Sequence, residues 1–135
     1  MTTAPTAYPC LSYRDAPAAM EWLKKAFGLK EMLVVPGENG SVAHAEMSLG
    51  EGVIMVGSGR SEFGWASPLD LRGSTASVYV AIPNPDEHYA HAKAAGAEIT
   101  IELYDSDWGS RGYSAKDIEG HHWSFGTYQP AANGS

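Results

Sequence analysis

The chain has 135 residues, of which 44% are hydrophobic and 19% are charged, and its formal net charge at pH 7 is −7. This size and composition indicate one ordinary globular domain whose core needs no disulfide or structural metal. An acidic chain without a basic face makes nucleic acid a poor candidate partner.

The N-terminal segment, Met1 to Ala7, is small and polar, with neither a basic leader nor an apolar run. No stretch of the sequence has the length and apolar character needed to span a bilayer. Cys10 is the only cysteine, so a disulfide within the chain is excluded and a reducing compartment is favoured. We therefore expect a cytoplasmic protein without a membrane partner.

Two helices are predicted by capping signals around apolar residues of helical spacing. Asp15 can cap the first helix, and Gly28 is placed to end it in the left-handed conformation. Asn84 and Glu87 have the spacing of an N-cap and its capping-box partner, and Gly96 ends this second helix. The two cap-to-glycine spans differ by one residue, which indicates an internal duplication.

Strand-like runs surround each helix, and a hairpin follows each set. The predicted strands of the first half are Tyr8 to Tyr13, Lys30 to Val35, Val42 to Leu49 and Val53 to Val56. Those of the second half are Ser77 to Ile82, Glu98 to Leu103, Arg111 to Lys116 and His122 to Tyr128. The pattern is βαβββ, twice, an α+β fold in one domain over residues 1–135. Module one covers about 7–57, the linker 58–75 and module two about 76–129, with a concave groove opposite the helices.

Three segments resemble the glyoxalase/bleomycin resistance protein family of the vicinal oxygen chelate superfamily. They are YPCLSYRDAPAAMEWLKKAFG, HAEMSLGEGVIMV and DWGSRGYSAKDIEGHHWSFGTY, within a resemblance from about Tyr8 to Tyr128. The resemblance implies a two-module vicinal-oxygen-chelate fold, a small-molecule ligand in the groove and a homodimer. Metal-dependent relatives take one ligand, usually His or Glu, from the first and last strand of each module.

Aligning the strands places those four ligand positions at Tyr8, Met55, Ser77 and Ser124. A phenol, a thioether and two hydroxyls bind divalent ions poorly, since such ions are held by imidazole and carboxylate. We therefore expect no metal and no cofactor. The absence of His and Glu from the four ligand positions argues against metal catalysis of the glyoxalase or extradiol dioxygenase kind.

Strand alternation sorts the remaining residues between the groove and the helices. The residues predicted to line the groove are Tyr8, Cys10, Ser12, Val53, Met55, Ser77, Tyr79, His122 and Ser124. The residues predicted to face the helices are Leu11, Ile54, Val78, Val80, Trp123 and Phe125. A slip of one residue would invert this assignment.

His122 and Glu46 are the candidate catalytic residues, as a general acid or base near neutral pH. His44 lies two residues from Glu46, so both project to one face of a strand. They could serve a metal or a proton relay, or form a hydrogen-bonded pair at the groove wall or a dimer edge. For His88 and His91, one helical turn apart, we expect a solvated helix face rather than a metal site. His121 follows a turn glycine, where an imidazole more often holds backbone groups.

Aromatic residues and one cation complete the predicted ligand site, which comprises Tyr8, Ser12, His44, Met55, Trp65, Ser77, Tyr79, Trp108, Arg111, Tyr113 and Ser124. Large aromatic rings on polar loops favour stacking on a flat ligand or at a subunit interface. Arg111 suits a carboxylate ligand, although an ion pair with Asp105, Asp107 or Asp117 is the favoured interpretation. Cys10 is expected to be an inert small hydrophobe.

Two hypotheses follow for the function. The first is metal-independent binding and sequestration of a flat or amphiphilic, antibiotic-like molecule, of the bleomycin-resistance type, and an acidic chain is compatible with a cationic ligand. The alternative is a lyase, isomerase or dioxygenase-like enzyme that uses an unusual metal site or a His/Glu proton shuttle. A weaker third hypothesis is an accessory subunit of a complex.

Overall fold

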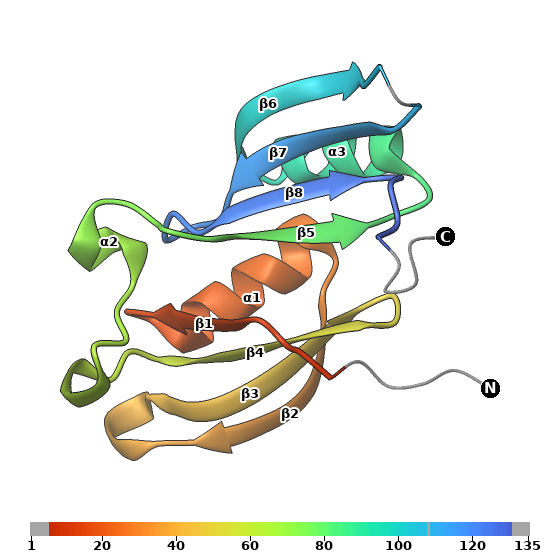
Figure 1. The fold of residues 1–135 in the computed structure, drawn as a ribbon. Coiled ribbons are helices and arrows are strands. Elements are labelled where there is room, and N and C mark those ends of the chain that lie inside the picture. Colours follow the sequence, from red (N-terminus) through yellow and green to blue (C-terminus); the bar gives the residue numbers. More distant parts are fainter. Residues whose placement is uncertain (1–5, 108, 131–135) are drawn as a thin grey trace.

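The first half of the chain forms one four-stranded sheet and one long helix. The computed structural model describes residues 6–107 and 109–130. Its first half contains β1 (Cys10–Tyr13), α1 (Ala16–Phe27), β2 (Lys30–Pro36), the 3-10 turn η1 (Glu38–Gly40), β3 (Val42–Leu49) and β4 (Gly52–Ser58). This sheet has the strand order β1-β4-β3-β2 (Figure 1).

The second half repeats this arrangement after a structured linker. The linker carries η2 (Ser61–Phe63) and the short helix α2 (Pro68–Leu71). The repeat consists of β5 (Ser77–Ala81), α3 (Pro85–Ala94), β6 (Glu98–Asp105), β7 (Arg111–Lys116) and β8 (His122–Gly126). Its strand order is β5-β8-β7-β6. In both sheets the first strand of the half lies next to the last, and the second strand is at the far edge.

Both sheets have the same mixture of pairings. The first strand of each half is parallel to the last, and the other pairs are antiparallel. The α+β fold of two βαβββ units predicted from the sequence is therefore confirmed. Strand β1 is shorter than predicted, because its pairing with β4 begins only at Cys10, opposite Met55. Among residues 6–107 and 109–130, none of the helices combines the length and apolar character needed to cross a membrane.

The helix ends follow the predicted signals in α1 but only in part in α3. The Asp15 side chain accepts a hydrogen bond from the backbone N–H of Ala18 at 3.1 Å, and Gly28 ends α1 with a left-handed φ of 78°. Helix α3 begins after Asn84, as predicted, but the Asn84 side chain makes no cap hydrogen bond. The predicted capping box is therefore wrong, although the position of the helix is right.

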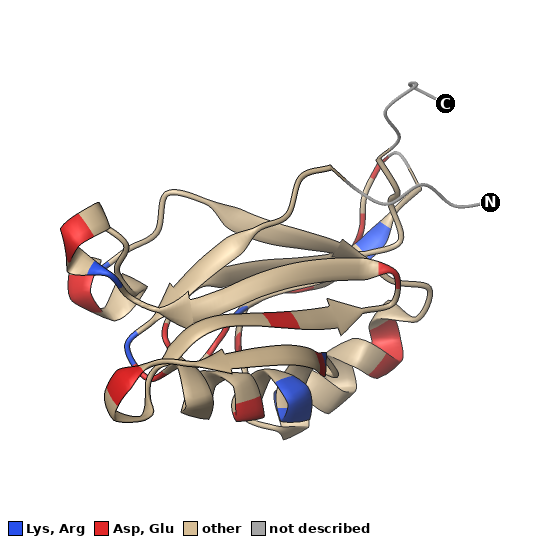
Figure 2. Cartoon of the chain, turned by 90° about the horizontal axis from the view of Figure 1, so that it is seen from below, with Lys and Arg blue, Asp and Glu red and all other residues tan. Residues whose placement is uncertain are grey.

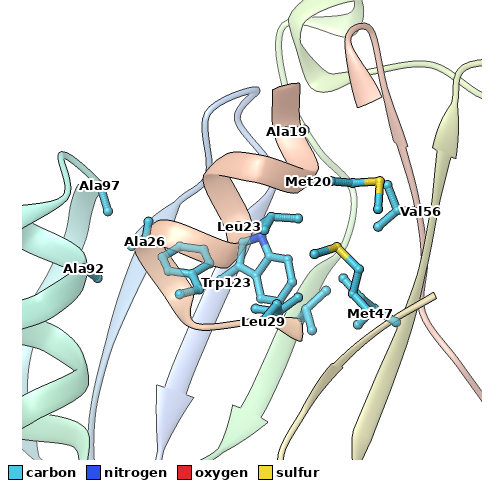
Figure 3. Packing of buried hydrophobic residues seen from close by; sticks show 14 of the residues in the cluster. Ala19, Met20, Leu23, Ala26, Leu29, Met47, Val56, Ala92, Ala97 and Trp123 are labelled. Atoms are coloured by element: carbon cyan, nitrogen blue, oxygen red, sulfur yellow. The ribbon is translucent and has the colours of Figure 1, made fainter. Parts of the chain in front are cut away.

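Helix α1 packs against both sheets and joins the two halves into one core. The ring of Phe27, at the end of α1, lies 5.3 Å from the ring of Trp123 and 4.9 Å from that of Phe125, both on β8. Figure 3 shows Leu23 of this helix beside Trp123 of the second sheet, and Met20 near Met47 of the first sheet. The helices lie on one side of the sheets (Figure 2), which leaves the other side of the strands open.

The alternation predicted for the strands is confirmed on the helix side. Ile54, Val78, Trp123 and Phe125 are buried in the core, and Leu11 and Val80 pack against it. The predicted groove residues Cys10, Ser12, Met55, Ser77 and His122 are exposed or half-buried on the other side.

His88 corrects the prediction of a solvated face on α3. The imidazole is half-buried, with its ring 4.3 Å from that of Phe125. Its Nε2–H donates to the backbone carbonyl of Phe27 at 2.8 Å, and its Nδ1 accepts from the Tyr113 hydroxyl at 2.6 Å. Burial lowers the pKa of His88, so the neutral ring is the form that joins the halves.

Candidate functional site

A cavity of about 890 Å³ lies where β1 and β4 of the first sheet meet the linker and the first residues of β5 and β8. Six residues predicted as site residues line it: Ser12, His44, Met55, Trp65, Ser77 and His122. These residues come from both halves of the chain and from the linker. The duplication therefore brings together side chains that are up to 110 positions apart in sequence.

Strand pairing explains how the two sheets contribute to this cavity. Ser77 and His122 are cross-strand partners in the β5–β8 pair, so their side chains leave the sheet on the same face. Met55 lies between Cys10 of β1 and Glu46 of β3, and Cys10 also lines the cavity. The wall formed by β1 and β4 is consequently mostly apolar, whereas the β5–β8 side presents a hydroxyl and an imidazole.

His44 and Glu46 form the hydrogen-bonded pair that their spacing predicted. His44 Nε2 lies 2.9 Å from Glu46 Oε2, and both side chains are partly exposed. Only His44 lines the cavity. A carboxylate behind an imidazole can orient the ring and stabilise its protonated form, so this pair has the geometry of a proton acceptor at the cavity wall.

His121 also lines the cavity, but its ring is committed to the backbone as predicted. Its Nε2 lies 2.8 Å from the carbonyl oxygen of Ser12, to which it donates, and the ring packs edge-on against Tyr13 at 4.7 Å. This contact ties the β7–β8 turn of the second half to β1 of the first.

The outer wall of the cavity is a small hairpin in the linker. Arg60 and Trp65 form an antiparallel bridge, with the Arg60 N–H 2.8 Å from the Trp65 carbonyl and the Trp65 N–H 3.0 Å from the Arg60 carbonyl. Gly64 turns this hairpin with a left-handed φ of 76°. The Trp65 side chain remains 57% exposed and lies 5.0 Å from the ring of Phe63. The indole therefore has an uncovered surface next to the cavity.

Arg60 was not among the predicted site residues, although it lines the cavity beside Trp65. The guanidinium lies 5.1 Å from the centre of the Phe63 ring and donates from Nε and Nη2 to Glu62, at 3.1 and 2.8 Å. A signal for it was present in the sequence, since Arg60 is followed within five residues by two aromatic residues on a polar, glycine-containing loop.

A buried carboxylate anchors the linker to the rest of the molecule. Glu119, in the β7–β8 turn, is 5% exposed and accepts hydrogen bonds from the Ser67 hydroxyl at 2.6 Å and from the backbone N–H groups of Arg14 and Asp15 at 2.6 and 2.8 Å. The Arg14 guanidinium forms an ion pair with Asp70 of α2. Nothing in the local sequence around Glu119 predicts these long-range partners.

Several predicted ligand-binding residues lie elsewhere. Tyr79 and Ser124 are cross-strand partners on the open face of the second sheet, outside the cavity. The Tyr79 hydroxyl donates to the Tyr128 carbonyl at 2.7 Å, and the Ser124 hydroxyl lies 2.7 Å from that of Ser114. Tyr8 is 37% exposed and precedes Pro9, which lines the cavity. Trp108 lies outside the described residues.

Arg111 and Tyr113 have structural contacts instead. Arg111 forms an ion pair with Asp105, as favoured, and a second with Asp86, which was not foreseen. Tyr113 was predicted near the ligand, but it is 2% exposed and stacks on Phe125 in the core. Because side chains alternate along β7, Tyr113 points toward the helices, and burial raises the pKa of its hydroxyl.

The side chains of the site do not fit a divalent metal ion. Met55 and Ser77 line the cavity, but a thioether and a hydroxyl are weak ligands for such ions. Within residues 6–107 and 109–130, no group of three or more His, Cys, Asp or Glu side chains is arranged to hold a metal ion.

Comparison with known proteins identifies a family. The model of the Glyoxalase/Bleomycin resistance protein/Dioxygenase superfamily matches residues 6–125. The chain is 31% identical over 129 residues to Mb0911c of Mycobacterium bovis, covering 90% of this chain and 82% of the relative. It has the same identity to Rv0887c of Mycobacterium tuberculosis, covering 74% of that protein.

Solved structures share the fold over nearly the whole chain. TioX from Micromonospora sp. ML1 superimposes with a TM-score of 0.75 at 31% identity, covering 94% of this chain and 98% of TioX. The genomically encoded fosfomycin resistance protein FosX from Listeria monocytogenes, solved with Mn(II) and a sulfate ion, has a TM-score of 0.65 at 14% identity and covers 95% of both chains. At that identity FosX supports the fold alone.

Proposed function

Because the chain belongs to the Glyoxalase/Bleomycin resistance protein/Dioxygenase superfamily, we propose that it binds a flat or amphiphilic small molecule in the cavity beside the linker, without a metal ion. The observation that supports this most directly is the exposed indole of Trp65 at the edge of a cavity of about 890 Å³. Cavities of this size enclose drug-sized ligands, and they are usually lined by apolar and aromatic groups with a few polar ones.

The composition of the walls supports binding by stacking and shape rather than by coordination. Met55, Leu71 and Trp65 supply apolar surface, and Ser12 and Ser77 supply hydroxyls. A flat ring on Trp65 would cover surface that the fold leaves exposed. One solved structure of the same fold is described as a fosfomycin resistance protein, so antibiotic-like molecules are a reasonable first class of ligand to test.

Protection of Cys10 from alkylation tests this proposal. Cys10 is exposed, lines the cavity and is the only cysteine, so the rate of its reaction with iodoacetamide reports on occupancy. We expect members of a panel of aromatic antibiotics to slow the reaction and Trp65→Ala to weaken this protection. Phe63→Ala is the matched control, because Phe63 is an exposed aromatic of the same hairpin that does not line the cavity. A panel without any protection would refute the proposal.

Catalysis by proton transfer is the second candidate function, favoured by the 2.9 Å contact between His44 Nε2 and Glu46 Oε2 at the cavity wall. In this alternative, His44 takes a proton from the bound molecule and Glu46 stabilises the imidazolium, with His122 as a second acid or base. Mass spectrometry of a ligand after incubation separates the two functions. Unchanged ligand supports binding alone, whereas conversion that is lost in His44→Gln supports catalysis.

We also propose a homodimer, because the outer strands of both sheets expose large apolar side chains. Met32, Leu33 and Val35 of β2 and Ile101 and Tyr104 of β6 are each between 43% and 56% exposed. Uncovered apolar residues on edge strands favour association. Light scattering after size exclusion would give the mass of a dimer, and a 14.4 kDa species across micromolar concentrations would contradict it. The single, exposed Cys10 supports a cytoplasmic location, which cell fractionation tests.

A further inference from the structure

The cavity differs in charge from the rest of this acidic molecule. The chain has 16 Asp and Glu residues, yet none of the described residues that line the cavity is acidic. The lining instead contains Arg60 and the imidazoles of His44, His121 and His122. Figure 2 shows acidic residues on the helices and in the turns. Among the described residues that line the cavity, the formally charged side chain is therefore a cation, Arg60, although the chain as a whole is acidic.

Three carboxylates beside the cavity have hydrogen-bond partners. Glu46 accepts from His44, and Glu62 accepts from Arg60. Glu119 accepts from one hydroxyl and two backbone N–H groups below the linker and is buried. A cationic ligand would find no carboxylate among the described residues that line the cavity, whereas an anionic ligand would find Arg60 there.

The hairpin places a cation and a flat ring side by side. Arg60 and Trp65 exchange both backbone hydrogen bonds across their bridge, so their side chains leave the hairpin on the same face. Both residues line the cavity. The Arg60–Glu62 pair is exposed, at 49% and 57%, and such pairs contribute little, so the guanidinium can transfer its donors to a ligand at small cost.

We propose that the cavity takes a flat aromatic molecule that carries an acidic group, with its ring on Trp65 and its carboxylate on Arg60. This inference rests on the small-molecule binding proposed above and specifies the chemical class of the ligand. It replaces the cationic ligand with which the net charge was compatible. Charges beyond about 8 Å are largely screened at physiological salt, so the local donors outweigh the distributed acidic charge at the site.

Three naphthalene compounds with one ring system and different charges test the class: 2-naphthoate, 2-naphthamide and naphthalen-2-ylmethylammonium. Isothermal titration gives their affinities, and slower alkylation of Cys10 shows that each occupies this cavity. We expect 2-naphthoate to bind about tenfold more tightly than the amide, as one charge-assisted contact of roughly 1.4 kcal/mol would give, and the ammonium to bind most weakly.

Arg60→Gln should abolish the preference for naphthoate over naphthamide and leave the affinity for naphthamide unchanged, which also verifies that the hairpin is intact. Arg72→Gln is the matched control, because Arg72 is an exposed arginine of the same linker that does not line the cavity. If the ammonium binds as tightly as naphthoate, or if Arg60→Gln retains the preference, the assigned class is wrong. If none of the three protects Cys10, the proposed binding function fails and this inference with it.

Discussion

The Ser67 hydroxyl donates to the Glu119 carboxylate at 2.6 Å, although the two residues are 52 positions apart in sequence. Ser67 is 1% exposed and caps α2, whose residues Pro68 and Leu71 line the cavity. Because Glu119 also accepts from the backbone N–H groups of Arg14 and Asp15, one carboxylate fixes the linker to the start of α1. The shape of the ligand cavity therefore depends on a buried group that does not line it.

Replacement of Glu119 tests this anchor. Glu119→Gln presents an amide N–H₂ to a backbone N–H, leaving a buried donor without an acceptor, so the free energy of unfolding should fall by about 1–3 kcal/mol. Urea denaturation measures this change. Glu51→Gln, in the exposed turn between β3 and β4, removes the same charge and should change stability by less than about 0.5 kcal/mol. Equal effects of the two substitutions would show that Glu119 anchors nothing.

His88 should make stability depend on pH. Burial holds the pKa of folded His88 below its ordinary value of 6.5, so between the two values the unfolded chain binds more protons. Stability is therefore retained above pH 6.5 and declines as the pH falls below it. In His88→Gln, urea unfolding at pH 8.0 and pH 5.5 should show a smaller difference than in the wild type. The other histidines are the same in both proteins, so their contribution to the pH dependence cancels in the comparison. If His88→Gln loses as much stability between pH 8.0 and pH 5.5 as the wild type does, His88 is not the cause.

Truncation of Trp123 should cost much stability, whereas truncation of Trp65 should cost little stability and weaken ligand binding. Trp123 is 1% exposed, contacts Phe27 and donates to Asp117 at 3.1 Å, so Trp123→Ala should lower the free energy of unfolding by about 3–5 kcal/mol. Trp65→Ala should change it by less than about 0.5 kcal/mol while weakening protection of Cys10. Urea denaturation and the alkylation assay measure the two effects. A strongly destabilised Trp65→Ala protein would mean that the indole supports the fold.

The two helix starts offer a matched comparison of capping. Asp15 accepts a hydrogen bond from the backbone N–H of Ala18, so Asp15→Ala should cost about 1 kcal/mol of stability. The Asn84 side chain makes no cap bond, so Asn84→Ala should cost much less, within about 0.5 kcal/mol. Thermal unfolding of the two variants side by side checks the order. A reversed order would contradict the cap geometry.

The sequence predicts the features that depend on local pattern. The alternation that places Ile54 and Trp123 in the core, and the signals at Asp15 and Gly28, act within a few residues. The burial of His88 could not be predicted from local pattern, because its partners, the carbonyl of Phe27 and the hydroxyl of Tyr113, are distant in sequence.

The same limit applies to the candidate site. Ser77 and His122 could be predicted by alternation, and both line the cavity. Glu119 could not, because its partner Ser67 lies 52 residues earlier in the chain. For Arg60 the sequence offered only the nearby aromatic residues, and the conformation of the linker is what places it at the cavity. Tyr113 was predicted near the ligand but lies in the core, because the alternation along β7 points its side chain toward the helices.

Helix α1 packs against both sheets, which has a consequence for any attempt to separate the halves. A chain divided within the linker would leave Phe27 bare on one fragment and Trp123 bare on the other. The two fragments should associate when mixed and should tend to aggregate when separate. The two similar halves therefore behave as one cooperative folding unit.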